Sequence, residues 1–578
     1  MTGPPAPPIP APTRRASRLV AWAVVPALLA GLIFAENRQF RRTTCETYDE
    51  YTYLMMGLAV YRDGNFAALA SPMDPPLPIV LNYWLPALRA EHEPMTPEFD
   101  REVPALMRQA RLLASVQTGV PLVLLLYAWI ARRRGWLAGA LAGALVALSP
   151  TVVAATSIAA TDGPFALGGV VAAAGLAYFA ARPGRGSYLV AGGALGFGLA
   201  CKQSAAIFFP LALVELLLQG PATRRPGWTT TDVVLRRGGR AAVRMVGLVV
   251  LAFLVSWACY AFRTAPYGAP GTSTTLPVVV PMVANLLPGG AAITEYARNL
   301  GMPLSVDTFV GQMDHAAQGH PAFLMGMHSR EGWWYFFPVA LAVKSTPAEL
   351  TLIALALALC CRPATWRDPS RRIWLGASLL MLGAGVASHI NIGQRYMILV
   401  YPLAILLGAD WLGSVAGRRH RWAGAAGGLL VVGQAVSAVG IAPHYLSYFN
   451  SFCGGPMQGH RYLVDSSLDW GQDLPALRDL LEARRYRQVA LNYFGTAQAD
   501  VYGLRLVDWQ TPDDTVAAQT DYLAISATQL MGAYGPDSRL YDRLKGLPSA
   551  RAGYSIFVYD LADPRVRAAW DEIRAWRP

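Results

Sequence analysis

Five charged side chains stand beside long apolar segments of the sequence, where a charge is costly. Asp49 and Glu50 lie in YDEYTYLMMGLAVYRDGNF, just after the first apolar segment, and Asp162 lies in SIAATDGPF. Lys202 lies in GLACKQS and Arg395 in NIGQRYMILVYP. Ionisable groups near membrane segments are candidates for a functional site, because lipid does not solvate charge. A carboxylate could take a proton from a hydroxyl as general base, and cations could hold a phosphate as leaving group.

Lysine is rare in this chain, and its positions are therefore informative. Only Lys202, Lys344 and Lys545 occur among 49 basic residues, and the first two lie at or within apolar segments. A compact ammonium group is a good partner for a phosphate at a bilayer surface. The alternative is an anchor whose stem lies along the lipid. For Asp49 and Glu50 the alternative is a pair of acids at a helix N-terminus. The residues alone leave these alternatives open.

The composition predicts a polytopic α-helical membrane protein. Of 578 residues, 54% are hydrophobic and 15% charged, whereas soluble proteins carry about 25% charged residues. Apolar runs of roughly 18 to 22 residues alternate with short arginine-rich loops. The net charge of +12 arises largely from these loops, so it is a topology signal and no nucleic-acid partner is expected. The six cysteines have no CxxC spacing and predict no disulfide framework.

We predict about 11 membrane spans. They lie at about 17–36, 112–131, 135–152, 163–181, 187–201, 204–219, 243–262, 336–360, 372–388, 395–413 and 421–441. Because alternate loops collect the arginines, the positive-inside rule places the N-terminus and a disordered leader, 1–16, in the cytoplasm. The transmembrane module is then 17–441, with outer loops 37–111 and 263–335. A cleaved signal peptide is an alternative for the first span, which is long for one and lacks an A-x-A site.

The last segment, 442–578, has the character of a soluble domain. LPALRDLLEARRY has the apolar spacing of an amphipathic helix, and QVALNYFG, DYLAISA and YSIFVYDL have the composition of strands. The topology therefore predicts a C-terminal extracytoplasmic α/β domain on the same side of the membrane as Asp49 and Glu50.

Six motifs, in order along most of the chain, carry a resemblance to a known family. They are YDEYTYLMMGLAVYRDGNF with MDPPLPIVLNYWLPAL, ATDGPFAL, GLACKQSAAIFFP, GHPAFLMGMHSREGWWYFFPVALAVKSTPAEL, IGQRYMILVYP and FNSFCGGPMQGHRYLVDSSLDWGQDLPAL. Together they resemble the membrane-embedded C-type glycosyltransferases that use polyprenyl-phosphate sugars. The branch they resemble is that of protein O-mannosyltransferases and lipid A aminoarabinose transferases. Each motif alone is weak evidence for the family. The occurrence of all six in the same order makes the resemblance specific.

The resemblance implies roles for particular residues. Asp49 would be the catalytic base, and Glu50 would support it or bind acceptor. Asp162 would orient the acceptor or help to hold a divalent metal ion, whose requirement stays unknown. The residues expected at the donor phosphate are Lys202, Arg395 and Tyr396, with Arg111 and Lys344 as weaker candidates.

Two further groups of residues lie in the predicted outer regions. His315, His320 and His328 are five and eight residues apart, a spacing that does not suit one helical face. We therefore expect loop or acceptor contacts from them rather than metal ligation. Asp465 and Asp469, in DSSLDWGQDL, are expected to dock the outer domain on the membrane module.

The function predicted from these features is inverting sugar transfer. A polyprenyl-phosphate-linked donor would pass its sugar to a hydroxyl of a protein, lipid or cell-wall glycan acceptor at the outer face of a bacterial plasma membrane. The alternative is a transporter or flippase of a lipid-linked or anionic substrate. Transporters usually carry internal repeats, and none is evident in this sequence. A third possibility is a scaffold that presents the outer domain.

Overall fold

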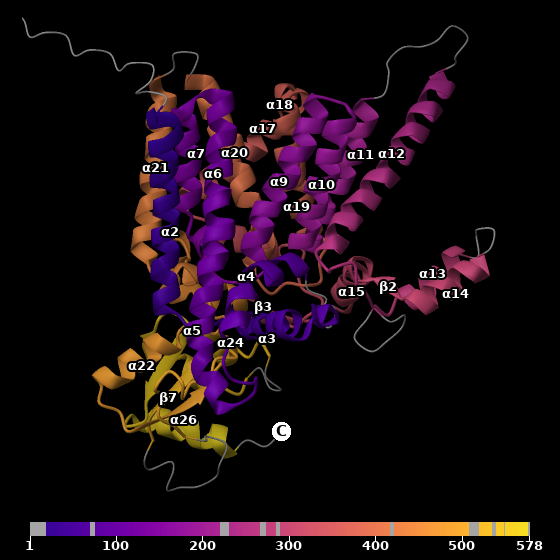
Figure 1. The fold of residues 1–578 in the computed structure, drawn as a ribbon. Coiled ribbons are helices and arrows are strands. Elements are labelled where there is room, and N and C mark those ends of the chain that lie inside the picture. Colours follow the sequence, from indigo (N-terminus) through magenta and orange to yellow (C-terminus); the bar gives the residue numbers. More distant parts are fainter. Residues whose placement is uncertain are drawn as a thin grey trace, which may run out of the picture.

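The computed structural model is a bundle of long helices with a small β-sheet layer at one end (Figure 1). It describes the residue ranges 19–69, 75–219, 230–265, 273–284, 290–416, 421–507, 520–534, 539–547 and 549–575. The predicted leader, 1–16, lies outside these residues.

Six helices among the described residues are long and apolar enough to cross a membrane, which makes this a multi-pass membrane protein. They are Val20–Thr43, Pro97–Arg134, Asp162–Ala181, Leu235–Ala258, Gln394–Ala416 and Trp422–Ile441. A seventh span is obtained if α7 (Trp136–Ala147) and α8 (Pro150–Ser157), which bend by 66° at their junction, are counted together. Shorter apolar helices, including Gln203–Leu218 and Pro347–Cys360, fall below this length. The count of eleven stays a prediction.

The breaks between helices have local causes. Ser149 caps α8 by accepting a hydrogen bond from the backbone N–H of Val152, and Pro150 follows as the first helical residue. Helix α16 (Phe336–Lys344) has Ser345 as its C-cap, and α17 (Pro347–Cys360) begins with a capping box between Thr346 and Glu349. Both breaks fall within segments that the sequence predicts as single spans, 135–152 and 336–360, so hydropathy alone does not place them.

Three helices of the predicted first outer loop occupy the end of the bundle that faces the sheet. Helix α3 (Tyr48–Asp63) lies across this end, next to α4 (Pro76–Arg89) (Figure 1). Helix α5 (Pro97–Ala114) continues into α6 (Val120–Arg134), so the chain passes from this surface layer into the bundle without a break. The loop therefore forms a helical platform at the bundle end.

The C-terminal region forms a five-stranded mixed sheet with the order β6-β5-β7-β9-β8. The strands are β5 (Gln488–Asn492), β6 (Leu506–Val507), β7 (Thr520–Ser526), β8 (Ala550–Ala552) and β9 (Ile556–Asp560). β5 pairs parallel with β6 and β7, while β9 pairs antiparallel with β7 and β8. Helix α22 (Leu474–Ala483) buries Leu474, Leu477 and Leu481, spaced three and four residues apart, in one apolar cluster with strand residues such as Val489.

The remaining elements complete the bundle, the second loop and the C-terminal region. The helices are α2 (Val25–Thr43), α9 (Asp162–Ala181), α10 (Arg185–Cys201), α11 (Phe208–Leu218), α12 (Thr230–Ala258), α13 (Leu276–Ala284), α14 (Gly290–Leu300), α15 (Leu304–Gln318), α18 (Pro363–Arg367), α19 (Pro369–Val386), α20 (Val400–Ala416), α21 (Arg421–Ile441), α24 (Ala527–Leu530), α25 (Asp542–Lys545) and α26 (Pro564–Ala575). Two short hairpins pair β1 (Thr264–Ala265) with β2 (Met302–Pro303) and β3 (Ala322–Leu324) with β4 (Met327–Ser329).

Candidate active site

Four charged side chains from distant parts of the sequence meet at the bundle end that carries α3. Arg395 donates from Nη1 to Asp49 Oδ2 at 2.9 Å and lies 3.8 Å from Asp162 Oδ2. Lys202 donates from Nζ to Asp162 Oδ1 at 2.5 Å. Asp162 thus bridges the two cations, and Asp49 contacts one of them. The structure therefore brings together four of the residues that the sequence predicts.

Element ends position these four groups. Asp49 lies in the first turn of α3, and Asp162 is the first residue of α9, where the helix dipole favours a negative charge. Lys202 is the C-cap residue of α10, in extended conformation, and Arg395 lies in a short 3-10 helix, Gln394–Met397, that leads into α20. Charges at helix ends can point into a shared space while the apolar helix bodies stay in the membrane.

Aromatic rings hold the two cations. The ring centroid of Tyr396 lies 4.8 Å from Lys202 Nζ and 5.6 Å from the guanidinium carbon of Arg395. The indole of Trp470, a buried residue, lies 4.1 Å from the same guanidinium carbon. Such cation–π contacts fix the plane of a guanidinium group without neutralising its charge. Tyr396 was predicted at this site, whereas sequence reasoning missed Trp470.

A cavity of about 330 Å³ opens onto these groups. Asp49, Lys202 and Arg395 line it, together with His315 and His320. The rings of the two histidines lie 6.3 Å apart. Burial, and the neighbouring His320, lower the pKa of His315.

His328, the third histidine considered from the sequence, does not line this cavity. His328 is exposed, and its Nε2 lies 2.8 Å from the carbonyl oxygen of Met531. Within the described residues, no three or more His, Cys, Asp or Glu side chains are grouped so as to hold a metal ion.

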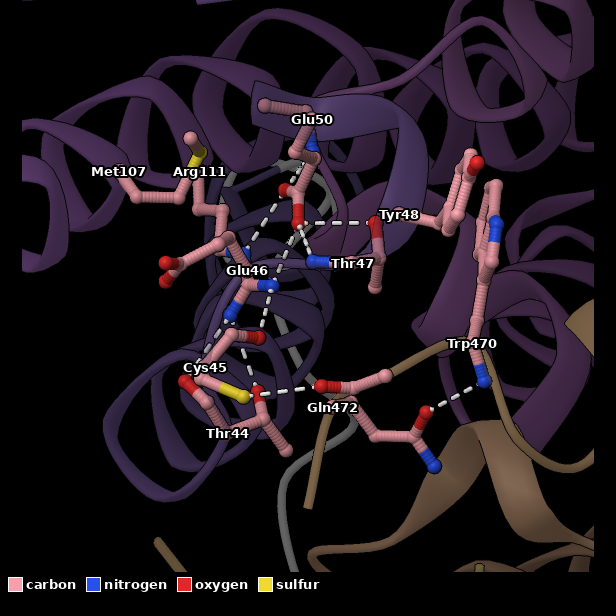
Figure 2. A network of polar contacts seen from close by, with 12 residues as sticks. Thr44, Cys45, Glu46, Thr47, Tyr48, Glu50, Met107, Arg111, Trp470 and Gln472 are labelled. Carbon is pink, nitrogen blue, oxygen red and sulfur yellow. Dashed lines mark hydrogen bonds and ion pairs between the residues drawn. The ribbon is translucent and has the colours of Figure 1, made fainter. Parts of the chain in front are cut away.

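Glu50 and Arg111 form a separate, fully buried ion pair (Figure 2). Arg111 donates from Nη2 to Glu50 Oε2 at 2.6 Å and from Nε to Oε1 at 2.8 Å, a bidentate geometry. Glu50 also accepts from the backbone N–H groups of Thr47 and Ala159, at 2.8 Å each. Arg111 donates further to the carbonyl oxygens of Thr44 and Cys45. Neither side chain lines the 330 Å³ cavity.

Lys344 is buried and does not line the 330 Å³ cavity. Its buried ammonium group donates to the carbonyl oxygen of Leu446 at 2.7 Å and to that of Ser467. It also lines a second space of about 30 Å³, together with Asp162 and Arg395. A space of this size suits one or two water molecules rather than a sugar. The structure therefore places Lys344 next to the charged cluster and outside the larger cavity.

The segment from Asp465 to Asp473 links the charged cluster to the sheet. Asp465 accepts a hydrogen bond from Tyr534, and Asp469 Oδ2 accepts from the backbone N–H of Thr528 at 2.8 Å. Burial raises the pKa of both carboxyl groups, that of Asp469 to about 7. Trp470, the residue after Asp469, contacts Arg395. The two acids thus bind other residues of the C-terminal region, to which they themselves belong. The docking role that we expect for them stays a prediction.

A family comparison confirms the resemblance to the C-type glycosyltransferases. Residues 106–260 match the model of the family described as dolichyl-phosphate-mannose-protein mannosyltransferase. This match includes Asp162 and Lys202 but not Asp49 or Arg395. No curated protein sequence matches the chain.

Solved structures give more distant similarities. An oligosaccharyltransferase from Archaeoglobus fulgidus, in complex with zinc and sulfate, is 14% identical, with a TM-score of 0.45, over 88% of this chain and 68% of that one. ArnT from Cupriavidus metallidurans, bound to undecaprenyl phosphate, is 14% identical, with a TM-score of 0.29, over 94% of this chain and 99% of that one. These scores are too low to support an argument about the site.

Proposed function

We propose that the protein transfers a sugar from a polyprenyl-phosphate donor to a hydroxyl acceptor, with inversion at the anomeric carbon. The observation that carries the proposal is the meeting of Asp49, Asp162, Lys202 and Arg395 at one end of the bundle, where Asp49, Lys202 and Arg395 line a common cavity and Asp162 contacts both cations. The family match supports the same class, because the matched family is named for transfer from a lipid-phosphate-linked mannose. The outer face of a bacterial plasma membrane and an acceptor on a protein, lipid or glycan belong to the proposal.

Asp49 is the proposed general base. Its side chain is 27% exposed, which leaves it accessible from the cavity. The acceptor hydroxyl gives its proton to the Asp49 carboxylate, and its oxygen forms a bond to the anomeric carbon. The bond from that carbon to the phosphate oxygen breaks, and its electron pair leaves with the polyprenyl phosphate. Attack on the face opposite the leaving group inverts the configuration.

Arg395 and Lys202 are the proposed phosphate ligands. Negative charge on the phosphate grows as the bond breaks, so fixed cations stabilise the transition state more than the bound donor. Asp162 contacts both cations and would hold them at one place until the phosphate arrives. The Asp49–Arg395 contact of 2.9 Å would have to open on donor binding. Opening would free one carboxylate and one guanidinium group for their separate tasks.

The other residues predicted at the donor take different parts in this proposal. Tyr396 would orient both cations, and Lys344 would support the wall behind them. Glu50 and Arg111 would fix the start of α3 and thereby the position of Asp49.

The test uses the purified protein in liposomes that contain candidate polyprenyl-phosphate sugars and a hydroxyl acceptor. The expected result is the appearance of free polyprenyl phosphate together with glycosylated acceptor. A flippase would move the intact donor across the bilayer without cleaving it. Movement of donor with no release of polyprenyl phosphate for any candidate sugar would contradict the proposal and favour the transporter alternative.

A further inference from the structure

A second cavity, of about 790 Å³, lies at the end of the bundle away from the candidate active site. Its lining includes Arg185 at the start of α10 and Arg244 in α12. The 17 residues of α10 separate Arg185 from the helix end that carries Lys202, a length of about 25 Å. The two cavities are therefore at opposite ends of the bundle, and this one is not explained by sugar transfer.

The cavity arises because α12 packs closely on α10 over only part of its length. Close approach is possible at Gly192 and Gly196, where an added Cβ would lie within 2.6 Å of Leu251 and Val255 atoms, respectively. The contact ends near Tyr188, whose hydroxyl donates to the carbonyl oxygen of Arg244 at 2.6 Å. Beyond this level α12 leans away from the bundle (Figure 1), and Tyr188 forms part of the cavity lining.

The arginines here differ from others at the same end. Arg133, Arg134 and Arg371 all pair with the buried carboxylate of Asp410, at 2.6 to 3.0 Å. Arg372 pairs with Glu215 at 2.6 Å.

By contrast, Arg185 and Arg244 are exposed and have no carboxylate within ion-pair distance in the part of the chain that the structure describes. Their positive charge is available to an anion that is not part of this chain.

The rest of the lining indicates what kind of anion fits. Gln219 donates to the carbonyl oxygen of Phe179, while its own Oε1 is buried and has no donor among the described residues. That oxygen would accept a hydrogen bond from a ligand hydroxyl. Next to the cavity, Leu189 on α10 and Val243 on α12 are 59% and 75% exposed, and Val246 and Val250 continue the apolar surface along α12. An apolar surface beside a cationic pocket suits acyl chains beside a phosphate.

We propose that this cavity binds the headgroup of an anionic phospholipid, with the phosphate on Arg185 and Arg244 and a headgroup hydroxyl on Gln219. The acyl chains lie against the exposed faces of α10 and α12. Basic pockets between transmembrane helices are typical sites for such lipids. The proposal stands independently of the reaction at the other end of the bundle.

The test is a lipid titration of the delipidated full-length protein in detergent, read as melting temperature. Dioleoyl phosphatidylglycerol should raise the melting temperature saturably, and dioleoyl phosphatidylcholine should not. The variant Arg185→Gln/Arg244→Gln should need a phosphatidylglycerol concentration roughly 30-fold higher for half of the effect, because each arginine near a headgroup contributes a substantial electrostatic attraction. The control, Arg132→Gln/Arg362→Gln, carries the same charge change outside the cavity and should behave as the unmodified protein.

Three outcomes would overturn the proposal. The first is an unchanged titration in the Arg185→Gln/Arg244→Gln variant. The second is an equal stabilisation by glycerol phosphate alone, which would identify a soluble anion as the ligand. The third is equal retention of the two lipids by Arg185→Lys/Arg244→Lys, the variant to be used if Arg185→Gln/Arg244→Gln proves unstable. This variant keeps both charges and should retain phosphatidylglycerol over phosphatidylcholine in native mass spectra from mixed micelles.

Discussion

Asp49 and Glu50 are neighbours in sequence and share the first turn of α3, yet the structure gives them opposite surroundings. Glu50 is fully buried and bound by Arg111, Thr47 and Ala159. Asp49 is partly exposed, contacts Arg395 and lines the 330 Å³ cavity. Consecutive residues on a helix point about 100° apart, so one faces the protein interior and the other the cavity. Adjacent acids can thus belong to two different ion pairs, one suited to stability and one to chemistry.

The largest expected effect is the loss of activity in Asp49→Asn. The amide keeps the shape of the side chain but cannot take up the acceptor proton, and loss of a general base typically lowers the rate by about 10²–10⁴-fold. Turnover of purified protein with a polyprenyl-phosphate sugar is the measurement. Asp63→Asn, at the exposed end of the same helix, is the matched control. Near-normal turnover by Asp49→Asn would remove its role as base.

Glu50→Gln should instead act on stability. It leaves the buried charge of Arg111 without its carboxylate, and breaking a buried ion pair in this way costs about 3–5 kcal/mol. The melting temperature of the detergent-solubilised protein should fall clearly, whereas Asp49→Asn should change it little. The double variant Glu50→Gln/Arg111→Met should be more stable than Glu50→Gln alone, because it removes the stranded charge. Equal melting temperatures for Glu50→Gln and Asp49→Asn would erase the distinction between the two pairs.

The two cations at the cavity, Lys202 and Arg395, should affect catalysis and use of the lipid donor. Lys202→Ala and Arg395→Ala should each raise the KM for the lipid donor and lower kcat on the order of 10²-fold, because the phosphate charge is greatest in the transition state. Arg395→Lys should rescue activity only in part, since lysine lacks the planar fork that meets two phosphate oxygens. If these residues only anchor the protein in the membrane, Arg395→Lys would be nearly silent and donor dependence unchanged. Activity must be normalised to folded, membrane-inserted protein.

The sequence predicted the charged cluster better than the arrangement around it. Asp49, Asp162, Lys202 and Arg395 could be found because each is a charge beside an apolar segment, where chance placement is costly. The division between Asp49 and Glu50 could not be found, because it depends on a contact with Arg111, 61 residues further along the chain. Hydropathy likewise located apolar segments but not the 66° bend between α7 and α8, which depends on local capping. Trp470 gave one usable signal, its position within DSSLDWGQDL, but its contact with Arg395 is purely tertiary.

Trp470 contacts both the start of α3 and Arg395, and its substitution should give the smallest effect. Its carbonyl oxygen accepts from the backbone N–H of Tyr48 at the start of α3, while its ring contacts Arg395. A side-chain change keeps the first contact and alters the second. A cation–π contact contributes about 0.5–2 kcal/mol, so Trp470→Leu should raise the donor KM roughly 2- to 30-fold. Trp470→Phe, which keeps an aromatic face, should fall between Trp470→Leu and the unmodified protein. If Trp470 has a purely structural role, both variants should have a lower melting temperature and an unchanged donor KM. That pattern would show that Arg395 is held by its carboxylates alone, and it would separate the sheet region from the chemistry of the cavity.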